Sequence, residues 1–408
     1  MRLRAGILSI LLAGAAFFTL REKDGHRWAQ GENLFLDFLI ANTRDAFERT
    51  KIDPSPEVVV IEFNEKDKAE FSAWPPAPLD YIILLKRIAE HKPDVVVMGD
   101  VLKWDQPDVP FLGELQERFR QFPLVALAFG ATINGATESP PVSENEDLPA
   151  FKFVQGDASS AKKLGSFIMP DRQLRTQMEL GFVIPYRGES EEHPLLLVAR
   201  AGDRLVPSLD AQMIALKEHT PYAEQRLRFG IGAGLHLGGR RFIPLSNDGS
   251  VKARLKSDPL HINAIDLLTP DLGDDAGRAL AKKLGKHKLI FLGARAEGAE
   301  TPARVAAWAL ALPTLHRAPE WMEWLGAAVA LLLAFVQLRF HRIGALAFSA
   351  GVLALGLAAA IVSFQSTLTW CAPHLALSFT LAGAVFCFLW PRPRRVSVDA
   401  NEPLQVPS

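Results

Sequence analysis

Four long apolar segments without acidic residues constrain this chain more than any other feature of its sequence. The segments are residues 5–20, 324–338, 343–364 and 365–390. The third is the clearest, because its 22 residues include no charged side chain and a helix of about 20 apolar residues spans a bilayer's hydrocarbon core. We therefore expect one transmembrane helix near the N-terminus and three near the C-terminus.

The N-terminal segment has two interpretations. At about 1.5 Å per residue its helix is about 24 Å long, slightly short of a bilayer's hydrocarbon core. This length fits a signal peptide or a short signal-anchor. The small residues 13–16 are compatible with cleavage, whereas Phe17 and Phe18 directly after them favour an uncleaved anchor.

Basic residues predict the orientation. They are Arg2 and Arg4 before the first segment, Arg339, His341 and Arg342 between the second and third, and Arg392, Arg394 and Arg395 after the fourth. Lys and Arg accumulate on the cytoplasmic side of a membrane. Four crossings, with an anchor at 1–20 and three helices in 321–390, place all three clusters there. We expect a multi-pass protein of the inner cell membrane, with residues 21–320 extracytoplasmic and 391–408 a short cytoplasmic tail.

Composition excludes several classes of protein. Lys plus Arg is 45 and Asp plus Glu is 46, so the net charge is −1, and the basic excess of a nucleic-acid-binding protein is missing. Two cysteines, Cys371 and Cys387, are too few for a disulfide framework or a four-thiolate zinc site. We predict no metal, no cofactor and no nucleic-acid partner.

The region between the membrane segments has the pattern of an α/β fold. Apolar strands are expected at 57–63, 94–99 and 124–129, and they alternate with helices at 79–91 and 109–122. This alternation predicts a parallel sheet with right-handed crossovers. Later segments add to the same domain: strands at 181–186, 195–206 and 288–292, a helix at 209–218 with Ser208 as its N-cap, and a hairpin of 241–245 with 251–255 around Asn247-Asp248-Gly249.

Five stretches in this order carry a resemblance. They are PEVVVIEFNE (56–65) with Trp74-Pro75-Pro76, DVVVMGDVL (94–102), GFVIPY (181–186), LLLVARAGDRLVPSLDAQMIAL (195–216) and KLIFLGARAEGAETP (288–302). Together they resemble the CHASE-two family, the second type of extracellular sensory domain found in cyclases and histidine kinases. The resemblance implies a sheet-centred extracytoplasmic sensory domain flanked by one N-terminal and three C-terminal transmembrane helices.

The chain departs from the family's pattern at several points. Asn64 stands where the family has an acidic residue after the first strand, and Pro78 lies near the position of a basic residue. Members commonly continue into a cytoplasmic cyclase or kinase, whereas only residues 391–408 follow the last apolar segment. We therefore expect no fused catalytic output module, since 18 residues cannot bury a core.

The candidate ligand site lies where the predicted strands end. Asp100 follows a buried parallel strand, and the carboxyl edge of such a sheet is where α/β proteins bind ligands. Glu62 and Asn64 share this edge, and Trp74 joins them as part of the Trp-Pro element. The alternative is that Asp100 only caps a turn or the next helix.

We expect a sensor that binds a small ligand or an envelope protein and signals through its membrane helices to a separate cytoplasmic effector, and a homo-oligomer is compatible with this role. A structural envelope or scaffold protein is the alternative. A membrane-tethered hydrolase is a third, although the sequence has no H-E-x-x-H or G-x-S-x-G motif. The leading prediction is therefore not an enzyme.

Overall fold

The structure is a computed structural model of the whole chain. It describes residues 2–21, 26–48, 57–63, 71, 74–105, 109–133, 148–176, 178–184, 195–221, 224–230, 233–238, 241–251, 259–268, 284–285, 289–294 and 301–390. The chain forms two compact units. The helical unit comprises residues 1–43 and 316–408, and the α/β unit comprises residues 44–315.

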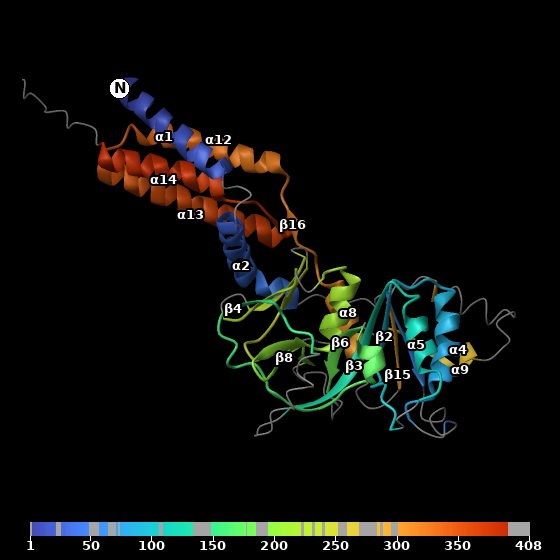
Figure 1. The fold of residues 1–408 in the computed structure, drawn as a ribbon. Helices are drawn as coiled ribbons and strands as arrows, with labels where there is room; N and C mark the ends of the chain where they lie inside the picture. The colour runs from blue at the N-terminus through green and yellow to red at the C-terminus, as the bar shows by residue number, and fades with distance from the viewer. Residues whose placement is uncertain are drawn as a thin grey trace, which may run out of the picture. The chain divides into compact units, whose positions relative to one another are not determined.

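The helical unit is a bundle built around α14. Its helices are α1 (Arg2–Arg21), the start of α2 (His26–Glu48), α12 (Glu320–Gln337), α13 (Arg342–Thr367) and α14 (His374–Leu389). Helices α1, α12 and α13 each pack against α14 (Figure 1). Small residues allow the close approach, since a Cβ at Gly383 of α14 would lie 3.0 Å from the Cβ of Ala334 in α12.

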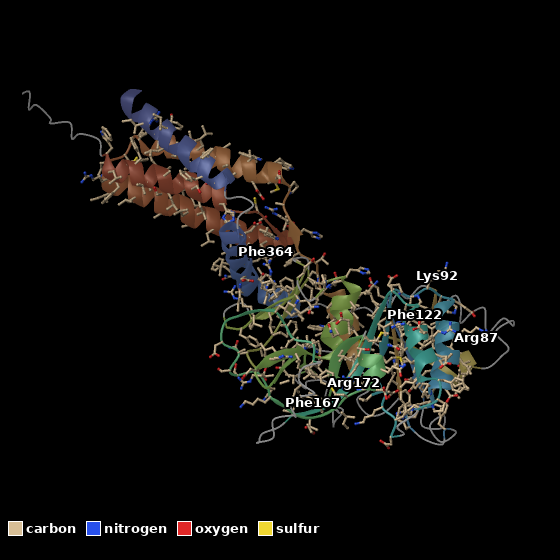
Figure 2. All side chains as sticks on the ribbon, viewed as in Figure 1. Arg87, Lys92, Phe122, Phe167, Arg172 and Phe364 are labelled. Carbon is tan, nitrogen blue, oxygen red and sulfur yellow. The ribbon has the colours of Figure 1, made fainter. Side chains whose placement is uncertain are left out.

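Two of these helices are long and apolar enough to cross a membrane among the residues that the structure describes, namely α12 and α13. Helix α1 includes a shorter apolar stretch, Gly6–Thr19, and α14 is also shorter, so the prediction of four spans stays a prediction. Much of the surface of α13 is exposed and apolar, with Ile343 75% and Leu355 73% exposed. Phe364, near its end, is fully buried (Figure 2).

A seven-stranded sheet forms the centre of the α/β unit. Its strand order is β14-β1-β15-β2-β3-β5, and β6 also pairs with β3. The strands are β1 (Val58–Phe63), β2 (Val95–Met98), β3 (Leu124–Ile133), β5 (Leu164–Ile168), β6 (Glu179–Val183), β14 (Leu260–Asn263) and β15 (Leu289–Ala294). All pairs are parallel except β3 with β5, as the alternation of strands and helices predicts.

Helices cover both faces of this sheet. On one face, alternate residues such as Val59 and Ile61 pack with α4 (Pro78–Ala89) and α5 (Leu112–Phe119). On the other, Val58 and Val60 pack with α8 (Leu209–Lys217) and α11 (Thr301–Ala311). Figure 1 shows the central strands between α8 and the α4–α5 pair. Burial on both faces explains why the strands are continuously apolar.

Local signals account for the helix starts. Pro78 occupies the first turn of α4, and the Asp80 carboxylate accepts a hydrogen bond from the Ala77 amide. The Ser208 hydroxyl accepts a hydrogen bond of 3.2 Å from the Ala211 amide at the start of α8. The predicted helices therefore exist close to their expected positions.

The remaining strands form smaller sheets. One has the order β12-β11-β10-β4, built from β4 (Phe153–Gln155), β10 (Arg226–Arg228), β11 (Gly234–Leu237) and β12 (Arg241–Pro244). Two short ladders pair β8 (Val198–Ala201) with β9 (Arg204–Pro207), and β7 (Leu195–Leu196) with β13 (Ser250–Val251). Two short helices are α7 (Arg172–Arg175) and α9 (Ala264–Leu268).

The predicted hairpin around Asn247-Asp248-Gly249 is described only in part, because residues 252–255 of its second strand lie outside the described residues. The turn forms, with the Gly249 amide donating to the Ser246 carbonyl. Its flanking strands, however, pair elsewhere: β12 with β11, and β13 with β7. A turn signal defines the local backbone but not the partners of the strands on either side of it.

Asp210 in the first turn of α8 predicts a pH dependence of stability. Its side chain is 3% exposed, and burial raises the pKa of its carboxyl group from 3.8 to about 7, against the smaller lowering effect of a backbone hydrogen bond. Between these pH values the unfolded chain loses the proton and the native chain keeps it. The free energy of unfolding should therefore fall as pH rises from about 4 to 7, then level off.

The substitution Asp210→Asn should remove this slope and stabilise the protein at pH 8, on the order of 3 kcal/mol, with little effect at pH 4. Denaturant unfolding of the full chain in detergent, followed by tryptophan fluorescence, measures it. An unchanged slope in the variant would show that Asp210 does not titrate in this range.

Candidate functional site

The candidate site lies at the carboxyl edge of the large sheet. Strands β14, β1, β15 and β2 are parallel neighbours, so their C-terminal ends meet at one edge. The register places Glu62 of β1 opposite Asn263 of β14 and Gly293 of β15. The Gly99 amide, just beyond β2, donates to the Leu292 carbonyl at 2.7 Å.

Glu62 pairs with a histidine. Its Oε2 lies 3.2 Å from Nδ1 of His261 on β14, and the two side chains are 11% and 28% exposed. Both lie on the α8–α11 side of the sheet, because Ile61 and Ile262 beside them belong to the core on the α4–α5 side. A carboxylate–imidazole pair at this edge accepts and donates hydrogen bonds.

Two glycines beside this pair serve packing. A Cβ at Gly99 would overlap the ring of Phe291, and one at Gly293 would lie 3.2 Å from the same ring. Phe291 is 1% exposed. The two glycines therefore make room for a core aromatic ring rather than for the backbone of a ligand.

An aromatic cluster occupies the other side of this edge. Phe63, at the end of β1, makes edge-to-face contacts with Phe71, Trp74 and Tyr81 at centroid distances of 5.6, 5.7 and 6.3 Å. Phe63 and Tyr81 are fully buried, whereas Trp74 is 38% exposed. Trp74 is thus anchored by the cluster and leaves part of its ring for a further contact.

Asp100 lies next to this cluster. Burial raises the pKa of the Tyr81 hydroxyl well above its ordinary value, and the negative charges of Asp100 and Asp80 raise it further. The hydroxyl group of Tyr81 is buried without a hydrogen-bond partner among the described residues. Tyr81 therefore stays neutral and offers an unused hydrogen-bonding group near the Asp100 carboxylate.

The structure separates the predicted site residues by face. Glu62 and His261 lie on the α8–α11 side, whereas Trp74 lies with Phe63 and Tyr81 on the α4–α5 side. The charge of Asp100 acts on Tyr81, on that second side. Asn64 lies outside the described residues. One edge therefore carries two polar groupings rather than one charged pocket.

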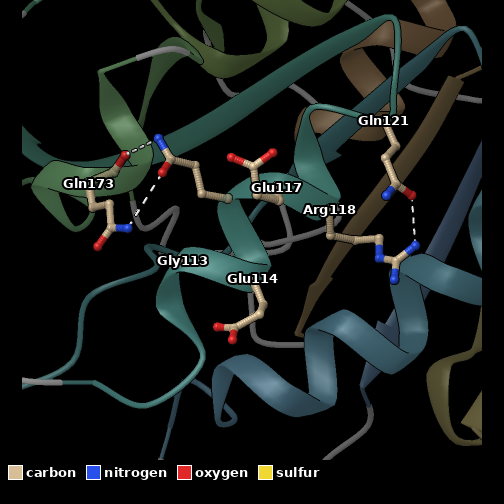
Figure 3. Close-up of a pocket in the computed structure, with 7 residues that line it drawn as sticks. Gly113, Glu114, Glu117, Arg118, Gln121 and Gln173 are labelled. Atoms are coloured by element: carbon tan, nitrogen blue, oxygen red, sulfur yellow. Dashed lines mark hydrogen bonds between the residues drawn. The ribbon is translucent and has the colours of Figure 1, made fainter.

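A polar hollow of about 580 Å³ lies elsewhere, along α5 (Figure 3). It is lined by Gly113, Glu114, Gln116, Glu117, Arg118, Gln121 and Gln173. The side-chain amide of Gln116 donates a hydrogen bond to the backbone carbonyl of Gln173 at 2.9 Å. At about 100° per residue the α5 positions cover roughly 200° of the helix, so this hollow is the exposed flank of a helix and not a cleft.

Sequence reasoning missed His261 and Tyr81. His261 comes from a strand far along the chain that had not been predicted, and Tyr81 has the spacing of an ordinary core residue. Among the residues that the structure describes, no group of three or more His, Cys, Asp or Glu side chains is placed to hold a metal ion.

Comparison with known proteins identifies one family. The CHASE2 domain family matches residues 10–336. No curated protein and no solved structure matches the chain.

The Glu62–His261 pair predicts an energetic coupling. In a double-mutant cycle with Glu62→Gln and His261→Gln, the coupling should be about 0.5–1.5 kcal/mol, because the 3.2 Å contact is partly withdrawn from water. Chemical unfolding of the full chain and its three variants measures this coupling. Additive effects of the two substitutions would show that the pair contributes nothing.

Proposed function

Because the chain belongs to the CHASE2 domain family, whose domains are sensory and extracellular, we propose that it is a membrane-anchored sensor of the cell exterior. The α/β unit binds a small ligand or an envelope protein outside the inner membrane. The helices of the helical unit carry the resulting change to a partner on the cytoplasmic side.

This proposal rests on how much of the chain the family match covers. Residues 10–336 contain the whole α/β unit, most of α1 and nearly all of α12. The matched pattern is thus an α/β domain together with the helices that flank it. A protein in which a ligand-binding domain interrupts a helical bundle is suited to conduct a conformational change between them.

The exposed surfaces of α12 and α13 support the part of the proposal that places these two helices in the membrane. Trp321 and Trp324 at the start of α12 are 64% and 48% exposed, as expected of an aromatic belt at a membrane interface. Leu332 and Leu355 on α12 and α13 are 67% and 73% exposed. Lipid covers such side chains without the hydrophobic penalty they would meet in water.

Ligand contact is assigned to the carboxyl edge of the sheet. The part-exposed ring of Trp74, the Asp100 carboxylate and the Glu62–His261 pair supply apolar, anionic and hydrogen-bonding contacts there. Asn64, which directly follows β1, belongs to the same proposal. The Trp74 ring and the Asp100 carboxylate, on the α4–α5 side, suit a small polar ligand with one flat apolar face.

The proposal predicts that cellular output depends on the α/β unit. Residues 44–315 are replaced by an unrelated soluble domain so that the helical unit is kept, and transcript and phosphoprotein profiles are compared with those of wild type and of a strain lacking the chain. The replacement strain should match the deletion strain.

A matched control is the full chain with Arg204→Gln, the exposed first residue of β9, which should keep the wild-type profile. If the replacement strain also keeps the wild-type profile, a sensing role for the α/β unit is refuted.

A further inference from the structure

Two arginines hold the two ends of the segment through which the chain leaves the α/β unit. We call residues 312–317 the outgoing segment. Arg241, in the α/β unit, binds its start, and Arg317, in the helical unit, is its last residue. Each arginine makes its contacts inside its own unit.

Arg241 forms hydrogen bonds with the C-terminal end of α11. Its Nη1 donates to the carbonyl oxygens of Ala309, Leu310 and Leu312 at 2.7, 3.1 and 2.9 Å. Its Nε donates to Oε1 of Glu218 at 2.7 Å, at the end of α8. The side chain is 7% exposed.

This contact answers a general need of helices. The last carbonyl groups of an α-helix have no partner within the helix, and the negative end of its dipole attracts a cation. Arg241 satisfies three acceptors at once while Glu218 neutralises its buried charge. The ends of α8 and α11 are thereby tied together, and both helices pack on the same face of the sheet.

Arg317 binds three other parts of the helical unit. Its Nε lies 3.2 Å from Oε1 of Glu32 on α2, and its Nη2 lies 3.0 Å from Oε1 of Glu323 on α12. Its guanidinium group lies over the ring of Trp370, 5.6 Å from the centroid. Glu323 is 8% exposed, so this contact is largely withdrawn from water.

A short ladder joins the outgoing segment to the helices. Strand β16 (His316–Arg317) pairs with β17 (Thr369–Trp370), which lies between α13 and α14. The His316 amide donates to the Leu368 carbonyl at 3.0 Å, and the Ala318 amide donates to the Trp370 carbonyl at 2.7 Å. A displacement of β16 would therefore also displace β17, which connects α13 and α14.

The stretch of chain between the two arginine contacts is short. Three residues, Pro313, Thr314 and Leu315, lie between Leu312 and His316. Proline fixes one backbone angle, and the four steps from Leu312 to His316 span at most about 14 Å even when fully extended. Leu312 and Leu315 are 2% and 3% exposed, so the segment is held by packing as well.

We propose that Arg241 and Arg317 are the positioning residues of a two-point linkage that conducts displacements of α11 into the β16–β17 ladder and from there to α12, α13 and α14. This linkage rests on the proposed function, since it names the path by which a sensor of this build passes its signal. It requires that removal of the contacts of one arginine changes the structure around the other arginine.

Hydrogen exchange of the purified full chain in lipid nanodiscs tests the linkage. In Arg241→Gln the carbonyl groups of Ala309, Leu310 and Leu312 lose the hydrogen bonds that hold the end of α11. The amides of the 309–312 segment should therefore exchange at least about tenfold faster, and so should those of His316, Ala318 and the 367–371 peptide. The matched control Arg204→Gln should leave both regions unchanged. Faster exchange confined to Ala309–Leu312 overturns the proposal.

A second variant covers the case in which Arg241→Gln does not fold. Glu218→Gln keeps the carbonyl contacts of Arg241 and weakens only its neutralisation, so a smaller increase, about threefold, should appear in the same two regions. Unchanged exchange of the 367–371 peptide in a folded Glu218→Gln variant whose α11 end is loosened also overturns it. These measurements need no cellular signal, so the linkage and the sensing role can fail independently.

Cys371 supplies a separate readout at Arg317. Cys371 directly follows Trp370, whose ring lies beneath the Arg317 guanidinium group, and a cation beside a thiol favours the thiolate. Arg317→Gln should therefore move the pH profile of Cys371 alkylation, followed by peptide mass spectrometry, to higher pH. Arg241→Gln should raise the rate without moving the profile.

An unmoved pH profile in Arg317→Gln would show that the arginine does not lie at this contact, and would overturn its part in the linkage. Arg317→Lys keeps the charge but not the two-pronged geometry. It should restore the wild-type pH profile, while the exchange of the 367–371 peptide remains faster than in wild type.

Discussion

The exposed apolar surface of the helical unit is the physical basis of the proposed membrane anchorage. Helix α13 has 26 residues and hardly any polar side chains along its middle, and much of its apolar surface is uncovered by the rest of the chain. In water such a surface would drive association, whereas in a bilayer it costs nothing. A bilayer also demands that every backbone group be paired within its own segment, which a helix achieves. The proposed anchorage of the chain depends on this constraint.

The topology of the large sheet brings the end of the α/β unit to its centre. Strand β15 is the last strand of that unit in the chain, yet it lies between β1 and β2. Helix α11 follows it and packs against α8 and β1. A change at the carboxyl edge, where Glu62 and Trp74 lie, is therefore one helix away from the outgoing segment. The contacts of Arg241 lie at the end of that helix.

Local patterns predicted the elements, whereas their partners depend on distant parts of the chain. Pro78 and Ser208 mark the starts of α4 and α8, and apolar β-branched runs mark β1 and β2. The position of β15 between β1 and β2 could not be read from spacing, because strand order is a property of the whole sheet. For the same reason the Glu62–His261 contact, 199 residues apart, escaped prediction. The turn at Gly249 formed as its residues predict, whereas the described partners of β12 and β13, which are β11 and β7, come from elsewhere in the chain.

Cysteine labelling in intact cells tests the central proposal, that the α/β unit lies on the extracytoplasmic side of the membrane. In a chain with both native cysteines replaced by serine, Asp203→Cys places a thiol in an exposed turn of the α/β unit, and His341→Cys places one in the exposed loop between α12 and α13. A membrane-impermeant maleimide should label the first variant in intact cells and the second only after permeabilisation. Labelling of His341→Cys in intact cells, with Asp203→Cys protected, would contradict the account.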